Sequence, residues 1–340
     1  MIRQVTIKDI ARESGYSVAT VSRTLSGNGY PVNRETRKEI EACAQRLGYM
    51  PNIYARTLKT KTSNEVAVII PSFRNPFYTS ALVGIENELS RFHYELVFYM
   101  KQHDKVDAAP FISALSSKKF AGIIIANDCV SHELAVMLDE LQRDIPVVVL
   151  DGEIPDRRSL HGVFFDYQKG AAAAAEYLVK KGHRKVALIT KVIDRPTRQN
   201  VAKGFLHAFR ATDVVIGQED IFESDICDDF EAGFALGCAV ADARAGHTAV
   251  LANNDAVAAG ALSAMIKRNI RVPEDISIMG IDDNVYARMT TPRLTSVRVP
   301  SENMGVLAAK QLLETIAGRR PNSLFVKPEI VERDTVRKID

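Results

Sequence analysis

The stretch TIKDIARESGYSVATVSRTL, residues 6–25, decides the fold of the N-terminal part of this 340-residue chain. It contains two short helical patterns on either side of Gly15. In the first pattern Thr6 is a natural N-cap, and Asp9 stands three residues later at the capping-box position. The apolar residues of this pattern have the i, i+3, i+4 spacing of one helix face: Ile7, Ile10 and Ala11. The sequence therefore predicts a helix, a tight break and a second helix.

The second pattern has an outward face that suits a DNA major groove. Ser17 is its expected N-cap, while Val21 and Leu25 face inward at i and i+4. The opposite face carries short side chains and one long cation: Val18, Ala19, Ser22 and Arg23. Such a helix is slim enough to enter the groove, and an Arg can donate two hydrogen bonds to guanine. From these residues alone, an ordinary helical hairpin with a polar surface explains the pattern about equally well.

A longer motif separates the two interpretations. The pattern T-x-x-D-I-A-x-x-x-G-x-S-x-x-T-V-S-R resembles the DNA-binding head of the LacI/GalR family of bacterial transcription regulators. Residues 36–60, TRKEIEACAQRLGYMPNIYARTLKT, continue the resemblance, which extends over nearly the whole chain. It implies that Arg23, Val18 and Ala19 read bases. It also implies phosphate contacts that fix the position of the head, from Thr6, Ser17, Thr20 and Ser22.

Helix signals and the distribution of charge show where the DNA-binding head should end. A third helix is expected from its N-cap Asn33 to Leu47, ended by Gly48, so that residues 1–50 form an all-α helix-turn-helix domain. Residues 1–62 carry 11 Lys and Arg against 5 Asp and Glu, whereas the rest of the chain carries 33 against 37. A basic head on a slightly acidic body is typical of a protein that offers one surface to phosphate.

Residues 51–64 connect head and body. The segment PNIYARTL, residues 51–58, is shorter than the roughly 12–15 residues that an isolated helix needs, so a plain linker is the simplest interpretation. The resemblance implies instead a hinge helix that folds on DNA and pairs with that of a second protomer. Its implied DNA contacts are Asn52, Tyr54, Ala55, Leu58 and Lys59, with Leu58 wedged into the minor groove.

From residue 65 to 340, short apolar runs alternate with amphipathic helical segments. The runs are VAVII (66–70), ELVFY (95–99), GIIIA (122–126), PVVVL (146–150), KVALI (185–189), TAVLA (248–252) and SIMGI (277–281). This alternation predicts parallel sheets covered on both faces, and the length allows two doubly wound α/β subdomains. It resembles the periplasmic sugar-binding fold, whose chain crosses between subdomains. Crossings near Asp166, Ser296 and Phe325 would give an N-subdomain of 65–166 and 297–325 and a C-subdomain of 167–296 and 326–340.

An effector cleft is expected beyond the carboxyl ends of these strands, where ligands of open α/β sheets bind. The expected lining residues follow the apolar runs: Phe73, Asn75, Phe77, Asp128, Asp166, Asn254, Asp255 and Asp282. Carboxylates and amides beside aromatic faces bind sugars and other polyols. Asp and Asn after a strand also cap the next helix, and both roles stay open for Asn254 and Asp255.

One position departs from the family pattern. Many members carry Arg three residues before the Gly-Phe pair that is Gly204 and Phe205 here, and that Arg often grips the effector; this chain has Val201. Arg198 and Asn200 are the nearby candidates to replace it. The change argues against a standard pyranose or sugar phosphate.

The expected protein is a homodimeric repressor that binds a near-palindromic operator and responds to a small-molecule effector, a sugar or related metabolite. The chain lacks a leucine-heptad tail, so a tetramer is not expected. An inducer, a corepressor and a docking protein partner all remain open as effectors. A transport protein would need a signal peptide, and an enzyme a catalytic constellation; neither pattern is found. No cofactor, metal or membrane partner is expected, the four cysteines are expected to be buried thiols, and the predicted location is the cytoplasm.

Overall fold

The computed structural model describes residues 5–25, 32–47, 49, 63–100, 107–151, 160–192, 196–210, 212, 214, 216–243 and 245–339. The chain divides into two compact units, Met1–Thr62 and Ser63–Asp340. The predicted hinge contacts, Asn52, Tyr54, Ala55, Leu58 and Lys59, lie outside the described residues, so they rest on the resemblance alone.

The first unit contains three short helices around one small core. They are α1 (Ile7–Ser14), α2 (Val18–Leu25) and α3 (Arg34–Arg46). Ile10, Val21 and Ile40 supply one fully buried side chain from each helix. The predicted capping box is confirmed: the Asp9 carboxylate accepts from the Thr6 backbone N–H at 3.0 Å, and the Asp9 N–H donates to the Thr6 hydroxyl. Gly15 ends α1 with φ 73°, the left-handed conformation that a glycine adopts without steric cost.

The second unit contains two six-stranded sheets. The first has the order β11-β5-β4-β3-β1-β2, and the second β12-β10-β9-β8-β6-β7. The first sheet comprises β1 (Glu65–Ile70), β2 (Glu95–Met100), β3 (Gly122–Ala126), β4 (Val147–Leu150), β5 (His161–Phe165) and β11 (Leu324–Val326). The second comprises β6 (Val186–Lys191), β7 (Ile221–Ser224), β8 (Ala249–Ala252), β9 (Ser277–Asp282), β10 (Thr295–Arg298) and β12 (Glu329–Val331). The pairs are parallel except β10 with β12, which confirms the predicted pair of doubly wound subdomains.

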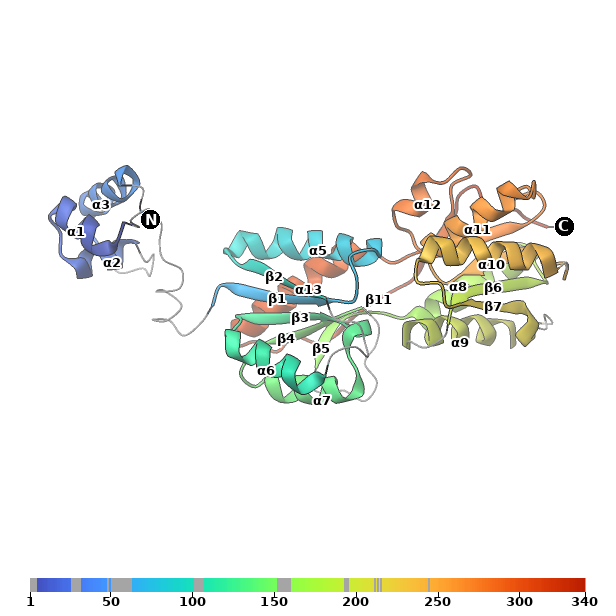
Figure 1. Cartoon of the computed structure of the whole chain (residues 1–340), viewed down its shortest axis with the longest axis horizontal. Helices are drawn as coiled ribbons and strands as arrows, with labels where there is room; N and C mark the ends of the chain where they lie inside the picture. The colour runs from blue at the N-terminus through green and yellow to red at the C-terminus, as the bar shows by residue number, and fades with distance from the viewer. Residues whose placement is uncertain are drawn as a thin grey trace. The chain divides into compact units, whose positions relative to one another are not determined.

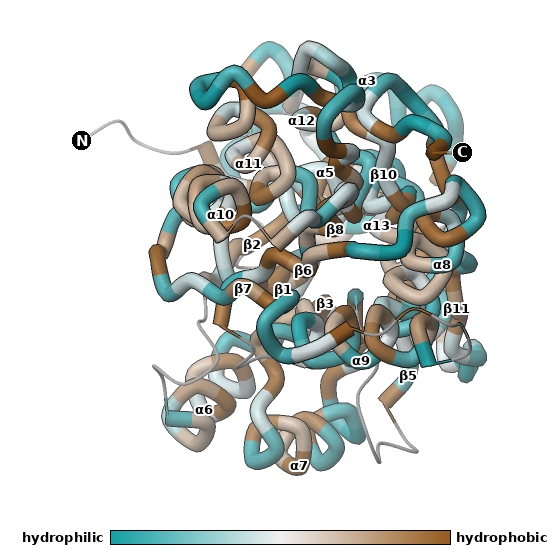
Figure 2. The backbone as a smooth tube through the Cα atoms, turned by 90° about the vertical axis from the view of Figure 1, so that its right-hand side faces the viewer, coloured by the Kyte–Doolittle hydropathy of each residue, from teal (hydrophilic) through white to brown (hydrophobic). Residues whose placement is uncertain are grey.

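Helices cover both faces of each sheet (Figure 1). On the first sheet, α5 (Pro76–Leu89) packs along α13 (Ser301–Ile316), and α6 (Ala108–Lys118) and α7 (His132–Leu141) cover the other face. On the second, α10 (Asp229–Ala243) packs along α11 (Asp255–Lys267), while α8 (Tyr167–Lys180) packs along α9 (Pro196–Arg210). A short helix, α12 (Val285–Met289), follows β9. The central strands are therefore buried on both sides, and in Figure 2 the tube is brown, for hydrophobic residues, at β1, β3 and β6.

The chain changes sheet three times. It passes from β5 in the first sheet to α8 and β6 in the second at Asp166, and from β11 back to β12 between Val326 and Glu329. The expected crossing near Ser296 falls inside β10, where Ser296 pairs with Gly280 and Val331. The chain leaves the second sheet only after Arg298, because the ladder with β9 continues to that residue.

Candidate DNA-binding helix and effector cleft

The start of α2 is organised by Ser17. Its hydroxyl oxygen accepts a hydrogen bond from the backbone N–H of Thr20 at 3.1 Å, which is the geometry of an N-cap. Ser17, Val18, Ala19 and Arg23 are exposed, whereas Val21 is fully buried in the core of the first unit. Thr20 and Ser22 are half-buried beside the exposed face. The structure thus places the predicted base-reading side chains on one exposed face of α2, with Val18 and Ala19 in its first turn and Arg23 in its last.

Thr6 is exposed at the start of α1, and its side chain caps that helix. Its hydroxyl donates to the Asp9 carboxylate at 2.6 Å, in addition to the capping box. The oxygen of a hydroxyl keeps acceptor capacity after donating, but its single proton is committed here. A phosphate contact from Thr6 would therefore involve the exchange of this bond.

A cleft of about 900 Å³ lies at the carboxyl ends of the strands of both sheets, within the size range of small-molecule sites. We call the part of the second unit built on the first sheet the first half, and the part built on the second sheet the second half. The first half contributes Pro71, Ser72, Phe73, Arg74, Asn75, Pro76, Phe77, Tyr78, Met100, Asp128 and Asp151. The second half contributes Tyr167, Lys191, Thr197, Arg198, Val201, Cys227, Asp228, Asp229, Phe230, Asn253, Asn254, Ala256, Asp282, Asn284 and Tyr286. Because both halves supply walls, a ligand that fills the cleft would contact both.

Aromatic side chains from the first half form one wall. Phe77 is buried and meets Tyr78 edge to face, with ring centroids 5.0 Å apart. Phe73 is 45% exposed and meets Phe98 of β2 edge to face at 6.1 Å. Asn75 caps α5, because its side-chain oxygen accepts from the N–H of Phe77 at 2.9 Å. The cap fixes the junction between the loop that carries Phe73 and the helix that carries Phe77.

Asp128 joins the two halves across the cleft. It accepts hydrogen bonds from the hydroxyl of Tyr78 at 3.4 Å and from the hydroxyl of Thr197 at 3.1 Å. Tyr78 belongs to the first half, whereas Thr197 stands on α9 of the second. A single carboxylate therefore connects the relative position of the halves to the state of the cleft.

Asp151 and Asp282 form the floor of the cleft. Asp151 follows β4 with φ 67°, and Asp282 ends β9 with φ 123°, conformations that side chains other than glycine rarely adopt. The Tyr167 hydroxyl donates to Asp151 at 2.7 Å. Burial, together with the neighbouring Asp151 and Asp282, raises the pKa of Tyr167 well above its usual value. Burial raises the pKa of Asp282 as well, reinforced by the nearby carboxylates of Asp255, Asp151 and Asp229.

Charged and amide side chains of the second half form the opposite wall. Lys191, at the end of β6, contacts Asp229 at 3.1 Å and donates to the carbonyl of Cys227 at 2.5 Å. The Asn254 side chain performs the capping role that the sequence leaves open, and it also lines the cleft. Its oxygen caps α11 by accepting from Val257 N–H at 2.9 Å, and its nitrogen donates to Asp229 at 3.0 Å beside the cleft.

Three of the predicted effector residues are not brought to the cleft lining. Asp166 caps α8 by accepting from the Lys169 N–H at 2.9 Å, and its carboxylate also pairs with the Lys169 ammonium. Asp255 is fully buried and accepts from the Ser296 hydroxyl at 2.6 Å and from the Asn284 N–H at 2.8 Å. Asn200 is half-buried on α9. The carboxylate of Asp166 is therefore used to cap a helix, and that of Asp255 is used in buried hydrogen bonds.

The other predicted residues, Phe73, Asn75, Phe77, Asp128, Arg198, Asn254 and Asp282, do line the cleft. Sequence reasoning missed Asp151, Tyr167, Lys191 and Asp229. Asp151 follows the run PVVVL directly, so the rule that selected Asp282 also identifies it. The expectation of buried thiols is wrong for Cys227, which is exposed at the cleft.

The side chains and helices of the described part of the chain bear on metal ligation and membrane insertion. No group of three His, Cys, Asp or Glu side chains there could hold a metal ion. Within the same residues, no helix is both long and apolar enough to cross a membrane.

These features define a class: a helix-turn-helix DNA-binding head followed by a periplasmic-binding-type body with a ligand-sized cleft. Residues 6–52 match the family model described as bacterial regulatory proteins, lacI family, and residues 175–336 match a periplasmic binding protein-like domain. The repressor PurR of Vibrio vulnificus strain CMCP6 is 30% identical over 345 residues, which cover 98% of this chain and 99% of that protein. The chain belongs to the LacI family of bacterial transcription regulators.

Solved structures support the same fold. A Lac repressor dimer bound to operator and the anti-inducer ONPF superposes with a TM-score of 0.86 at 23% identity, covering 98% of this chain and all of that chain. The complex of the regulator CelR with cellobiose gives a TM-score of 0.70 at 25% identity, with the same coverage.

Proposed function

We propose that this chain is a homodimeric repressor that binds a near-palindromic operator and is controlled by a small metabolite, a sugar or a related compound, in the cleft. The observation that carries the proposal is the cleft itself, whose walls come from both halves and are joined across it by Asp128 and Thr197. A ligand that binds one relative position of the halves more tightly shifts the population toward it. Two sites that bias one two-state element are the requirement for allostery.

The proposed DNA contacts divide by chemistry. Arg23, Val18 and Ala19 read base edges in the major groove, because all three are exposed on α2. Ser17, Thr20, Ser22 and Thr6 supply hydroxyl groups to phosphates, which position the head without reading sequence. The relatives favour this assignment, since the Lac repressor structure is a dimer bound to operator.

The proposed effector contacts are Phe73, Asn75, Phe77, Asp128, Arg198, Asn254 and Asp282. Their aromatic faces, amides and carboxylates suit a polar ring ligand. The structure of CelR is a complex with cellobiose, which favours a carbohydrate-sized ligand. As a regulator, the protein is proposed to act in the cytoplasm without catalysis, in keeping with relatives named as transcription regulators.

The test is selection of operator DNA by the full chain from a randomised duplex library. The proposal predicts enrichment of one site with two inverted half-sites, because a symmetric dimer presents two equivalent heads. Enrichment of a single unpaired half-site would contradict the dimer, and no enrichment would contradict sequence-specific binding. The selected operator then serves as the probe for effector screening.

A further inference from the structure

The turn after β9 combines a residue of the cleft lining with an uncommon backbone. Asp282 lines the cleft, and it and the next residue, Asp283, have positive φ angles of 123° and 53°. Residues other than glycine seldom adopt such conformations, although aspartate and asparagine do so more readily than most. These conformations persist only where neighbouring groups fix them. The contacts of this turn therefore decide whether it keeps its shape.

Two arginines bind the carboxylate of Asp283. Arg298 donates from Nε to one oxygen at 2.9 Å, and Arg333 donates from Nη2 to the other. Because the Asp283 side chain is only 7% exposed, these charge-assisted hydrogen bonds replace its hydration. The backbone N–H of Asp283 also donates to the hydroxyl of Ser296 at 3.1 Å. The turn is thus fixed through both its side chain and its backbone.

Arg298 also connects the turn to the places where the chain passes between the halves. It is the last residue of β10, directly before the crossing to α13 of the first half. Its Nη1 donates at 3.0 Å to Glu329, the first residue of β12, just after the chain returns from β11. The N–H of Val299, in the crossing to α13, donates to the carbonyl of Asp282 at 3.0 Å. The cleft floor is therefore linked to two of the three crossings.

We propose that the turn Asp282–Asp283, held by Arg298, transmits effector binding from the cleft to the crossings between the halves. This inference rests on the proposed function, in which the effector binds in the cleft and shifts the relative position of the halves. Domain movement is absorbed at the few residues that connect the domains. Arg298 and Glu329 flank two of these connections, so a change of the turn that moves Arg298 reaches both of them. The turn is then the element whose state both sites bias.

A matched pair of variants separates this role from a purely structural one. Glu329→Gln breaks the link between Arg298 and the crossing that precedes β12. Asp334→Asn breaks a comparable ion pair, with Arg293 at 3.1 Å, at the opposite end of the β10–β12 pair. The Glu329 and Asp334 side chains are 64% and 49% exposed, so either loss should change the free energy of unfolding little. Urea unfolding of both variants checks this.

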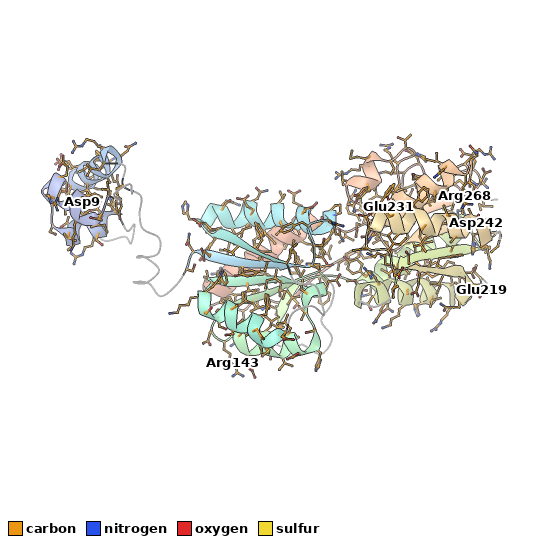
Figure 3. All side chains as sticks on the ribbon, in the orientation of Figure 1. Asp9, Arg143, Glu219, Glu231, Asp242 and Arg268 are labelled. Carbon is orange, nitrogen blue, oxygen red and sulfur yellow. The ribbon has the colours of Figure 1, made fainter. Side chains whose placement is uncertain are left out.

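A second control breaks an ion pair far from the crossings. Asp242 of α10 accepts a hydrogen bond at 2.9 Å from Arg268, which follows α11. Its side chain is 64% exposed, as is that of Glu329. Figure 3 shows Asp242 and Arg268 at the end of the second half that is remote from the first. Asp242→Asn therefore removes the same kind of charge without altering the turn or the crossings.

The test is amide hydrogen exchange of the full chain, followed by mass spectrometry, with and without the selected operator duplex. The operator binds the head, which belongs to the other compact unit, so a response in the peptides that cover residues 282–284 and 299–301 is transmitted from that unit. In the parent the operator should change the exchange rate of these peptides by roughly fivefold or more, since coupling between sites typically amounts to 5- to 150-fold.

The variants should divide by their place in the network. Asp283→Asn removes the charge and keeps a residue that tolerates positive φ, so it should abolish the response to operator. Glu329→Gln should reduce the response, and Asp334→Asn and Asp242→Asn should keep it. A purely structural network would instead raise exchange equally with and without operator, and would leave the response itself intact.

The inference requires a response that depends on Glu329 but not on Asp334. It is overturned if the parent peptides do not respond to operator, if Glu329→Gln responds as the parent does, or if Asp334→Asn loses the response as well. Failure to select any operator rejects the proposed function and this inference with it. A selected operator that leaves the turn unchanged rejects the inference alone.

Discussion

The hydroxyl of Thr197, on α9 of the second half, donates a hydrogen bond of 3.1 Å to Oδ1 of Asp128, in the turn after β3 of the first half. The same carboxylate accepts from Tyr78 through its other oxygen. A contact that links the halves beside the ligand site is sensitive to their relative angle. We therefore expect effector binding and domain movement to be coupled in free energy at this contact.

Thr197→Val should loosen this link. Loss of one hydrogen bond is expected to lower the free energy of unfolding by about 0.5–1.5 kcal/mol and to shift the halves toward wider separation. Small-angle scattering of the body together with urea unfolding would measure both. Thr79→Val is the matched control, because the Thr79 hydroxyl bonds only the Pro76 carbonyl within the first half. If both variants changed the scattering profile equally, Thr197 would not be the residue that links the halves.

Arg23→Ala should weaken binding to the selected operator by roughly 1–3 kcal/mol, with a smaller loss on random duplex, because a two-bond base contact is removed. Arg23 is exposed near the C-terminal end of α2. Filter-binding titrations at one salt concentration would compare the two DNAs. Equal losses on operator and random DNA would mean that Arg23 contacts phosphate and does not read bases.

Asp282→Ala should abolish the effector response and leave the operator affinity of the effector-free protein nearly unchanged. The carboxylate lines the cleft, and the α2 helix belongs to the other compact unit. Calorimetry with the effector found by screening would report the loss of binding. Unchanged effector affinity would reassign Asp282 to a purely structural role.

Stability should also depend on pH through Asp282. Its pKa is raised in the folded state, chiefly by burial, so the folded protein retains a proton that the unfolded chain has released. The free energy of unfolding should therefore fall as the pH rises above the unfolded value of about 4, by at most about 1.4 kcal/mol per pH unit for this group. Asp282→Asn should be relatively more stable at pH 8 than at pH 5. A difference between variant and parent that is constant or reversed across this range, by urea unfolding, would contradict the burial argument.

The fold followed from the sequence wherever an element was long or strongly patterned. The seven apolar runs correspond to β1, β2, β3, β4, β6, β8 and β9, and Thr6 and Asp9 form the predicted capping box. Five of the described strands were not among the predicted runs. Three of them, β7, β11 and β12, are edge strands of three or four residues whose side chains are exposed or half-buried, so they carry little apolar signal. The other two, β5 and β10, are interior strands of five and four residues.

The site was harder, because side-chain direction depends on tertiary structure. Asp128, Asp166, Asp255 and Asp282 all lie at or just beyond strand ends, yet Asp166 turns back to cap α8 and Asp255 turns inward to Ser296. Asp282 reaches the cleft in a backbone conformation, φ 123°, that no local sequence signal indicates. Lys191 was missed because the apolar run KVALI that predicted β6 ends at residue 189, whereas the strand continues to Lys191.

The central claim is that cleft and operator sites are coupled, and reciprocal titration of the full chain tests it most directly. Operator affinity is measured with and without saturating effector, and effector affinity with and without saturating operator. The account predicts that the two ratios are equal, within the 5- to 150-fold range typical of about 1–3 kcal/mol of coupling, because linkage is reciprocal. An effector that binds in the cleft while both ratios stay at one would contradict the account.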